Sequence, residues 1–211
     1  MSAPNCTDDT PLRSDHIVQF FDTDESRADR VAEFLADGYR RGESLVVVVR
    51  AAGWVALSAR LEALGVDTRV AAAEGMLLVK NAEDTLRRIS RVGSIDPDLF
   101  QDTVGKALSV LATRGRRVRA YGEMVDILAQ RDEMEEALAL EALWNVASEK
   151  FPIALMCGYS AAHFVSAATH AALRDICAAH SNVAQNGHDP LASWVLTTAH
   201  NCAADSSSMR H

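Results

Sequence analysis

Short, continuous hydrophobic runs alternate along the chain with longer stretches in which apolar residues recur at helical spacing. The runs at 16–21, 44–49, 76–79, 118–121 and 153–157 predict strands. The second run, a serine followed by leucine and four valines, has no polar alternation. Such a pattern is typical of a parallel strand that is buried on both faces.

The stretches between these runs predict helices. Asp22, Thr23 and Asp24 offer oxygen acceptors to cap the first helix, and Gly42 favours its end. Further helices are predicted over 54–64, 97–114, 123–130, 133–150 and 161–180, and Asp96 with Pro97 suits the start of the second of these. Repeated strand and helix units imply right-handed crossovers, so the sequence predicts an α/β fold with a mainly parallel sheet and helices on both faces.

The chain has 211 residues and is 48% hydrophobic, which suits one domain with an extension. We expect a flexible N-terminus over 1–14, a folded domain over 15–180, and a linker, short helix and mobile tail over 181–211. The N-terminus lacks the pattern of a signal peptide, and no apolar stretch approaches the roughly 20 residues that span a bilayer. A cytoplasmic protein without membrane contact is therefore expected.

The net charge of the chain indicates which partners it can bind. A net charge of −8 argues against direct nucleic-acid binding, because such binding depends on clustered Lys and Arg, and the one basic run, 114–119, is short. The cysteines lie far apart without a CxxC pair, which favours reduced thiols over a disulfide framework: Cys6, Cys157, Cys177 and Cys202.

Ligands of open parallel sheets bind outside the carboxyl ends of the strands, so the residues after each strand form the candidate site. They combine aromatic walls with a few polar groups, as small-molecule pockets do. Six are predicted to bind a ligand, beside Gly122 and Gly158: Phe21, Asp22, Arg50, Tyr121, Glu123 and Tyr159.

The geometry expected of this site is specific. Tyr121, Glu123 and Tyr159 should face one cavity, because the strands before them are expected to be neighbours. Arg50 can supply the counter-charge to Glu123, either as part of a ligand-responsive site or as a tie between two loop ends.

Motifs of the commonest enzymes are missing from the sequence. The turn FDTDES (21–26) has neither the glycines nor the lysine of a phosphate-binding loop, and GxSxG, HExxH and Gly-rich dinucleotide motifs do not occur.

Glu123 and Asp126 stand at a predicted helix start, where a capping role is favoured over general acid or base catalysis. Cys157 is interpreted as a small buried hydrophobe, and Trp144 as a packing anchor on one face with Glu141 and Asn145.

The last predicted helix contains several residues that can bind metals: His163, His170, Cys177 and His180. Only the last two have ligand spacing, and two ligands do not complete a tetrahedral site. We therefore expect no metal and no cofactor.

Five segments together resemble the MEDS domain, a sensory domain of methanogen and methylotroph regulators that include the repressor of dichloromethane degradation. They are HIVQFF (16–21), FLADGYRRGE (34–43), YGEMVDIL (121–128), LEALWN (140–145) and LMCGY (155–159). The resemblance covers about 15–180 and implies a three-layer, RecA-like core without a working Walker A loop. It also implies sensing of small hydrocarbon derivatives and signalling to a DNA-binding domain or histidine kinase. Because we find neither a helix-turn-helix nor a kinase segment, a partner in trans is expected.

Three hypotheses for the function remain open. The first is a non-catalytic sensory module that binds a small organic ligand and signals to a histidine kinase or transcription regulator. The second is a regulator of a kinase or sigma-factor pathway that binds only protein. Under either hypothesis the protein can form a homo-oligomer. The third, ranked last, is an enzyme that uses Glu123 or Cys157.

The missing phosphate-binding loop gives a direct prediction. Calorimetric titration with magnesium and ATP should show no binding and no hydrolysis, because the turn at 21–26 presents carboxylates where phosphate needs backbone and lysine donors. A micromolar affinity for ATP would contradict this prediction.

Overall fold

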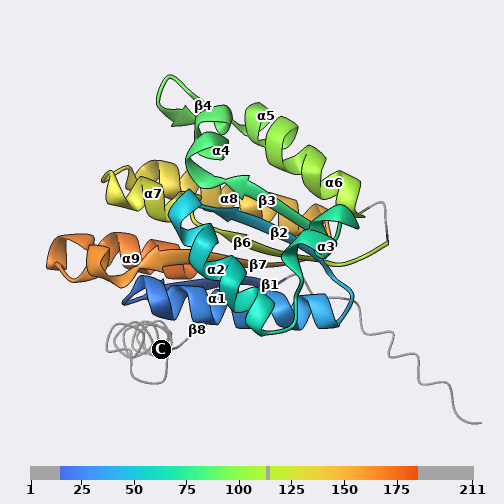
Figure 1. The fold of residues 1–211 in the computed structure, drawn as a ribbon. Helices are drawn as coiled ribbons and strands as arrows, with labels where there is room; N and C mark the ends of the chain where they lie inside the picture. The colour runs from blue at the N-terminus through green and yellow to red at the C-terminus, as the bar shows by residue number, and fades with distance from the viewer. Residues whose placement is uncertain (1–14, 113–114, 185–211) are drawn as a thin grey trace, which may run out of the picture.

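The computed structural model describes residues 15–112 and 115–184 as an α/β fold built on a parallel sheet (Figure 1). The strand order is β3-β2-β6-β7-β1-β8, and every neighbouring pair in this sheet is parallel. Their bounds are β1 Asp15–Phe21, β2 Ser44–Val49, β3 Leu77–Asn81, β6 Val118–Gly122, β7 Ile153–Ser160 and β8 Asn182–Ala184. The expectations for 1–14 and 185–211 lie outside the described residues.

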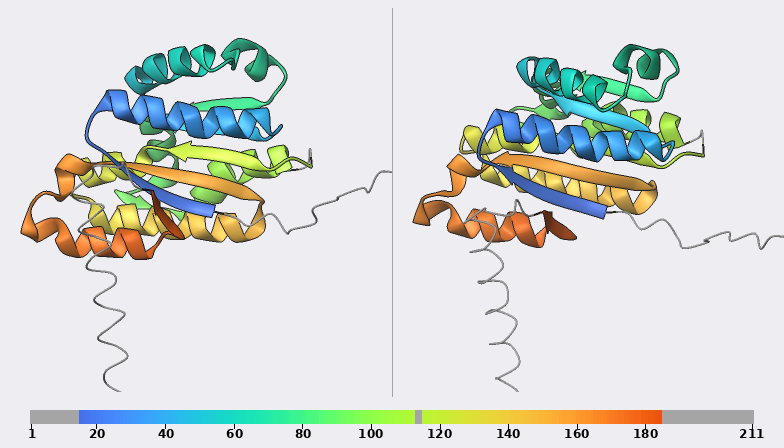
Figure 2. Two further views of the ribbon diagram at one scale, coloured as in Figure 1. Left: turned by 90° about the horizontal axis from the view of Figure 1, so that it is seen from below. Right: turned by 60° about the horizontal axis from the view of Figure 1, so that its bottom comes forward.

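Helices cover both faces of the sheet, which makes the three-layer, RecA-like arrangement that the sequence predicts (Figures 1 and 2). One face carries α1 Asp24–Arg40, α2 Ala51–Ala63 and α3 Thr68–Ala73. The other carries α4 Ala82–Ile89, α5 Pro97–Phe100, a π-helical turn Gln101–Gly105, α6 Lys106–Ala112, α7 Met124–Gln130, α8 Met134–Lys150 and α9 His170–Ala178. A small hairpin, β4 Ser90–Arg91 and β5 Ser94–Ile95, follows α4. No helix in the described part of the chain has the length and apolar character needed to cross a lipid bilayer.

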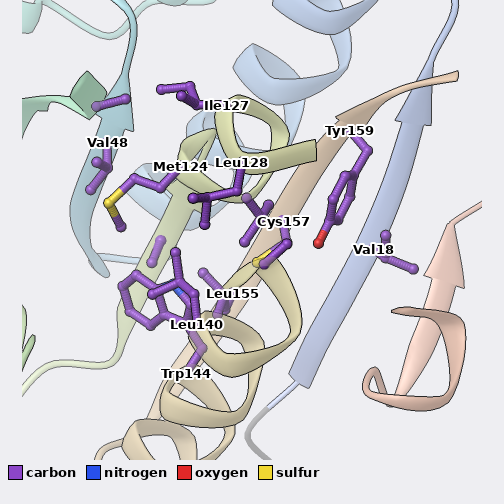
Figure 3. Close-up of a cluster of buried hydrophobic side chains, with 14 of the residues drawn as sticks. Val18, Val48, Met124, Ile127, Leu128, Leu140, Trp144, Leu155, Cys157 and Tyr159 are labelled. Atoms are coloured by element: carbon purple, nitrogen blue, oxygen red, sulfur yellow. The ribbon is translucent and has the colours of Figure 1, made fainter. Parts of the chain in front are cut away.

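The sheet separates two hydrophobic cores because successive side chains of a strand point to opposite faces. The larger core lies under α4–α9 and surrounds Trp144, whose ring meets Phe100 edge-on at 5.3 Å between centroids. Figure 3 shows part of it, with Leu155, Cys157 and Tyr159 of β7 pointing to the same side. The smaller core lies under α1–α3.

Local signals predicted several helix ends correctly. The Thr23 side chain accepts from the Ser26 backbone in a capping box at the start of α1, and Gly42 after this helix has a positive φ of 76°. Asp96 caps α5 by accepting from two backbone N–H groups, and Pro97 takes the first helical position.

The prediction of a single helix over 161–180 is wrong. Two 3-10 turns, Ala161–Phe164 and Ala167–Thr169, precede α9. Phe164 packs between Phe20 and Tyr159, and the Thr169 hydroxyl donates to the Ser166 carbonyl at 2.8 Å. Such local side-chain bonds compete with helix formation. The residues after α9, interpreted as linker, begin with strand β8, which pairs with β1.

The packing of Trp144 leads to a stability prediction. The residue is 1% exposed, so Trp144→Ala should lower the free energy of unfolding by about 3–5 kcal/mol through lost burial and the cavity left behind. Val146→Ala, two residues away on α8 at a position 44% exposed, is the control and should change it by less than about 0.5 kcal/mol. Chemical denaturation measures both, and equal effects would show that Trp144 is no packing anchor.

Candidate functional site

A pocket of about 170 Å³ lies at the carboxyl ends of β2 and β6, between α1 and α2. These two strands are neighbours, but β2 leads outward to β3 whereas β6 leads to β7 on its other side. Such a reversal is a topological switch point, where open α/β sheets bind ligands. The apolar wall of the pocket includes Ala28, Val31, Val49, Ala56 and Leu57. Its polar lining consists of Asp24, Arg27, Arg50, Tyr121 and Glu123, and the last four form what we call the polar end.

Glu123 is buried at this polar end, and both of its carboxylate oxygens have partners. The backbone N–H of Arg50 donates to Oε2 at 3.0 Å, and the guanidinium of Arg50 donates to the same atom at 3.4 Å. The Tyr121 hydroxyl donates to Oε1 at 3.1 Å. Arg50 therefore is the counter-charge of Glu123, as the sequence predicts.

Asp126, one turn further along α7, is fully buried and connects four elements. Its oxygens accept from the backbone N–H of Ser160 at 2.7 Å, from Arg50 at 3.0 Å and from Arg27 at 3.3 Å. Gln130 adds a bond at 3.1 Å. This carboxylate thus joins α7 to α1, to the end of β2 and to the end of β7.

The two arginines keep donors that the protein does not use. Nε of Arg27 and Nη2 of Arg50 are buried without a hydrogen-bond partner, the Asp24 carboxylate being 3.8 Å from the former. Burial alone would lower the pKa of Arg27, but the nearby Tyr121 hydroxyl and the carboxylates of Asp126 and Glu123 outweigh burial and raise it. Both residues line the pocket.

Tyr121 is held as a neutral phenol beside these charges. Burial raises its pKa well above the usual value, and the Glu123 carboxylate raises it further. Gly158 on the neighbouring strand makes room for the ring, since a Cβ there would lie 2.8 Å from the Tyr121 hydroxyl oxygen. The glycine of the LMCGY segment therefore serves the packing of Tyr121.

The expectation that Tyr121 and Tyr159 face one cavity is wrong. β6 and β7 are neighbours, but Tyr121 is level with Met156, and Tyr159 stands three residues further along β7. Because side chains alternate along a strand, the two tyrosines lie on opposite faces, each in a different core. Tyr159 points into the larger core (Figure 3), and its hydroxyl donates to Glu141 at 2.8 Å.

The other two predicted residues, Phe21 and Asp22, do not line the pocket. Phe21 is buried in the core next to Tyr121, with the guanidinium carbon of Arg27 5.3 Å from the centre of its ring. Asp22 is exposed and does not line the pocket.

Sequence reasoning missed the role of Arg27 and misread that of Asp126. The structure shows no side-chain capping bond at the start of α7, so the capping interpretation of Glu123 and Asp126 is wrong. A signal existed for both missed roles. Arg27 continues the buried stripe of Val31 and Leu35 at a spacing of four, and Asp126 interrupts a run of apolar residues. A charge in such a place has to find buried partners.

Comparison with known families gives a match to the MEDS model over residues 15–181. This model is described as the MEthanogen/methylotroph, DcmR Sensory domain. The chain belongs to the MEDS family. MEDS is a family of sensory domains, and the match spans the pocket and every strand of the parallel sheet except β8. A search of curated proteins finds no match.

The network around Asp126 in this MEDS domain leads to a prediction. Asp126→Asn keeps the shape of the side chain but removes its charge and turns an amide N–H₂ toward cationic donors. We expect the free energy of unfolding to fall by about 3–5 kcal/mol, as when one partner of a buried ion pair is lost.

Asp29→Asn is the matched control. Asp29 pairs with Arg60 at 2.7 Å, but it is 59% exposed, so its loss should cost less than about 1 kcal/mol. Urea denaturation of both variants measures the difference. A loss at Asp126 no larger than at Asp29 would contradict the assigned role.

Proposed function

We propose that this MEDS domain binds a small organic molecule in the pocket between α1 and α2. The observation that carries the proposal is the pair of unused, buried N–H donors of Arg27 and Arg50 at the polar end of an otherwise mainly apolar pocket. Unsatisfied buried donors are costly, and an acceptor atom on a ligand would satisfy them.

The dimensions and chemistry of the pocket narrow the ligand class. A cavity of about 150 Å³ holds one benzene molecule, so the 170 Å³ here suits a compound of about five to eight non-hydrogen atoms. The arginine donors call for an oxygen or halogen acceptor, and the alanine, valine and leucine wall calls for an aliphatic or halogenated body. Short alcohols, carbonyl compounds, carboxylates and halocarbons fit this description, whereas amines do not.

Arg50 links ligand binding to the helices. It is the residue before α2, and its guanidinium and backbone N–H both bond the carboxylates of the β6–α7 segment. A ligand acceptor that competes for this guanidinium would favour a state with a displaced α2, since only differential binding shifts a conformational equilibrium. The signal would then pass to a histidine kinase or transcription regulator in trans.

The role we propose is non-catalytic. The oxygens of Glu123 and Asp126 are engaged by donors, which disfavours either as a general base. Burial, and then the nearby Glu141 carboxylate, raise the pKa of the Cys157 thiol well above its usual value, which disfavours a nucleophilic thiolate.

A thermal-shift screen tests ligand binding. The panel contains short alcohols, carboxylates, halocarbons, amines and nucleotides. A compound from the expected classes at 100 times its Kd should stabilise the domain by about 2.7 kcal/mol and raise Tm by roughly 5–10 °C. A regulator that binds only protein would show no stabilisation by any of these compounds.

A variant in which a larger side chain fills the pocket tests whether the ligand binds there. Ala56→Leu puts a larger side chain into the pocket from α2 and should abolish the Tm shift. Val55→Leu is the control, because Val55 precedes it on the same helix and is 70% exposed outside the lining. A full shift in Ala56→Leu would exclude this pocket as the binding site.

A further inference from the structure

A second polar cluster lies in the larger core, on the opposite face of the sheet from the pocket. It consists of His16 on β1, Glu141 on α8, Cys157 on β7 and His180 just after α9. One ligand atom from each residue lies within 4.8 Å of all the others. The four side chains are nearly inaccessible to solvent, and both His180 and Glu141 are fully buried.

Four distances within this cluster are close to those between ligands of one metal ion. Nε2 of His16 lies 3.1 Å from Oε2 of Glu141 and 3.3 Å from Sγ of Cys157. Sγ is 3.2 Å from Oε2 of Glu141, and Nε2 of His180 is 3.3 Å from Oε1. Tetrahedral zinc, with bonds of about 2.0 Å to nitrogen and about 2.3 Å to sulfur, separates its ligands by roughly 3.3–3.5 Å.

Outer hydrogen bonds set the orientation of His16. Nδ2 of Asn145 donates to the Ala179 carbonyl at 2.9 Å, which fixes the amide so that Oδ1 faces the Nδ1 atom of His16 at 2.8 Å. Since Oδ1 can only accept, Nδ1 of His16 carries the proton. In the neutral ring Nε2 then presents its lone pair to the cluster.

His180 is oriented in the same way. Its Nδ1 atom donates to the Ile176 carbonyl at 2.7 Å, so the lone pair of the neutral ring is on Nε2. This Nε2 atom is buried and makes no hydrogen bond of good geometry, although Oε1 of Glu141 lies 3.3 Å away. Histidine ligands of metals are held by such bonds from the other ring nitrogen to a carbonyl or amide oxygen.

From this geometry we propose that His16, Glu141, Cys157 and His180 form a structural zinc site. Two neutral imidazoles, one carboxylate and one thiolate give a total charge of −2, which Zn²⁺ cancels, so the site would be neutral within the core. Mixed nitrogen, sulfur and oxygen ligands suit zinc better than the hard cations Mg²⁺ and Ca²⁺. This proposal departs from the expectation of no metal, which weighed only the ligand spacing of the last predicted helix.

The site would join segments far apart in the chain. Zinc would link β1, β7 and α8 to the end of α9 through His180, and the Tyr159 hydroxyl would orient Glu141 from outside the ligand set. With four protein ligands the site has no open position, which is the pattern of structural rather than catalytic zinc.

Metal content of the wild-type 211-residue chain is the first test. Protein purified without added chelator should hold about one zinc per chain, as measured by inductively coupled plasma mass spectrometry. Because the site is buried, EDTA should remove the zinc only when a denaturant is also present. Refolding with Co²⁺ should produce the absorption of a cobalt–thiolate bond and tetrahedral d–d bands.

Paired cysteine variants identify the ligand. Cys157→Ser should abolish the cobalt–thiolate absorption and weaken zinc binding by about 100-fold or more. Cys177→Ser, at the other free cysteine of the described residues, should keep both. His180→Gln should weaken zinc binding while preserving the thiolate absorption at saturating Co²⁺.

Specific results would overturn the proposal. Folded wild-type protein with less than about 0.1 zinc per chain, and no thiolate absorption after refolding with Co²⁺, would show that the cluster is an imidazole–carboxylate network without metal. Thiolate absorption that persists in Cys157→Ser and vanishes in Cys177→Ser would place the metal elsewhere. Both results are independent of ligand binding in the pocket, which the thermal-shift screen measures separately.

Discussion

The buried carboxylate of Asp126 needs hydrogen-bond donors, and this requirement positions the elements around the pocket. Removing a charge from water costs several kcal/mol unless donors surround it, and Asp126 obtains its donors from α1, from the end of β2 and from the end of β7. Each of these elements is therefore held relative to α7 by the same side chain. The position of Arg50, and with it the polar end of the pocket, depends on its hydrogen bond to Asp126.

The two faces of the sheet differ in how their polar groups meet water. Arg50 on the pocket side is 23% exposed in its side chain. The His16 cluster on the other face is sealed under α8 and α9. The polar groups of the pocket face are therefore closer to solvent than those of the other face.

The sequence was sufficient for the fold because hydrophobic periodicity is a local property. The valine run of β2 and the caps at Thr23 and Asp96 each depend on a few neighbouring residues. The position of Arg50 beside Glu123 followed from the rule that parallel strands end at one edge. The orientation of Tyr159 could not be predicted in the same way. The face of the sheet to which its side chain points, relative to Tyr121, depends on the register between β6 and β7, and strand order alone does not give that register.

Polar clusters were harder to predict because their members are distant in the chain. His16 is 129 residues from Asn145 and 141 from Cys157, so no spacing rule connects them. The break in the helix predicted over 161–180 places His180 where it meets Glu141, and apolar spacing gave no sign of that break. Only the unusual presence of a charge among buried residues, as at Glu141 in α8, marks such positions beforehand.

Strand β8 has a consequence for the solubility of shortened chains. It pairs with Ile17, Val18 and Gln19 of β1, and it lies just beyond residue 181, where the family match ends. A chain cut at that boundary would leave the backbone N–H and C=O groups along one side of β1 open to solvent. Open sheet edges recruit strands from other molecules, so a chain cut there should aggregate edge to edge more readily than one that keeps the short edge strand β8.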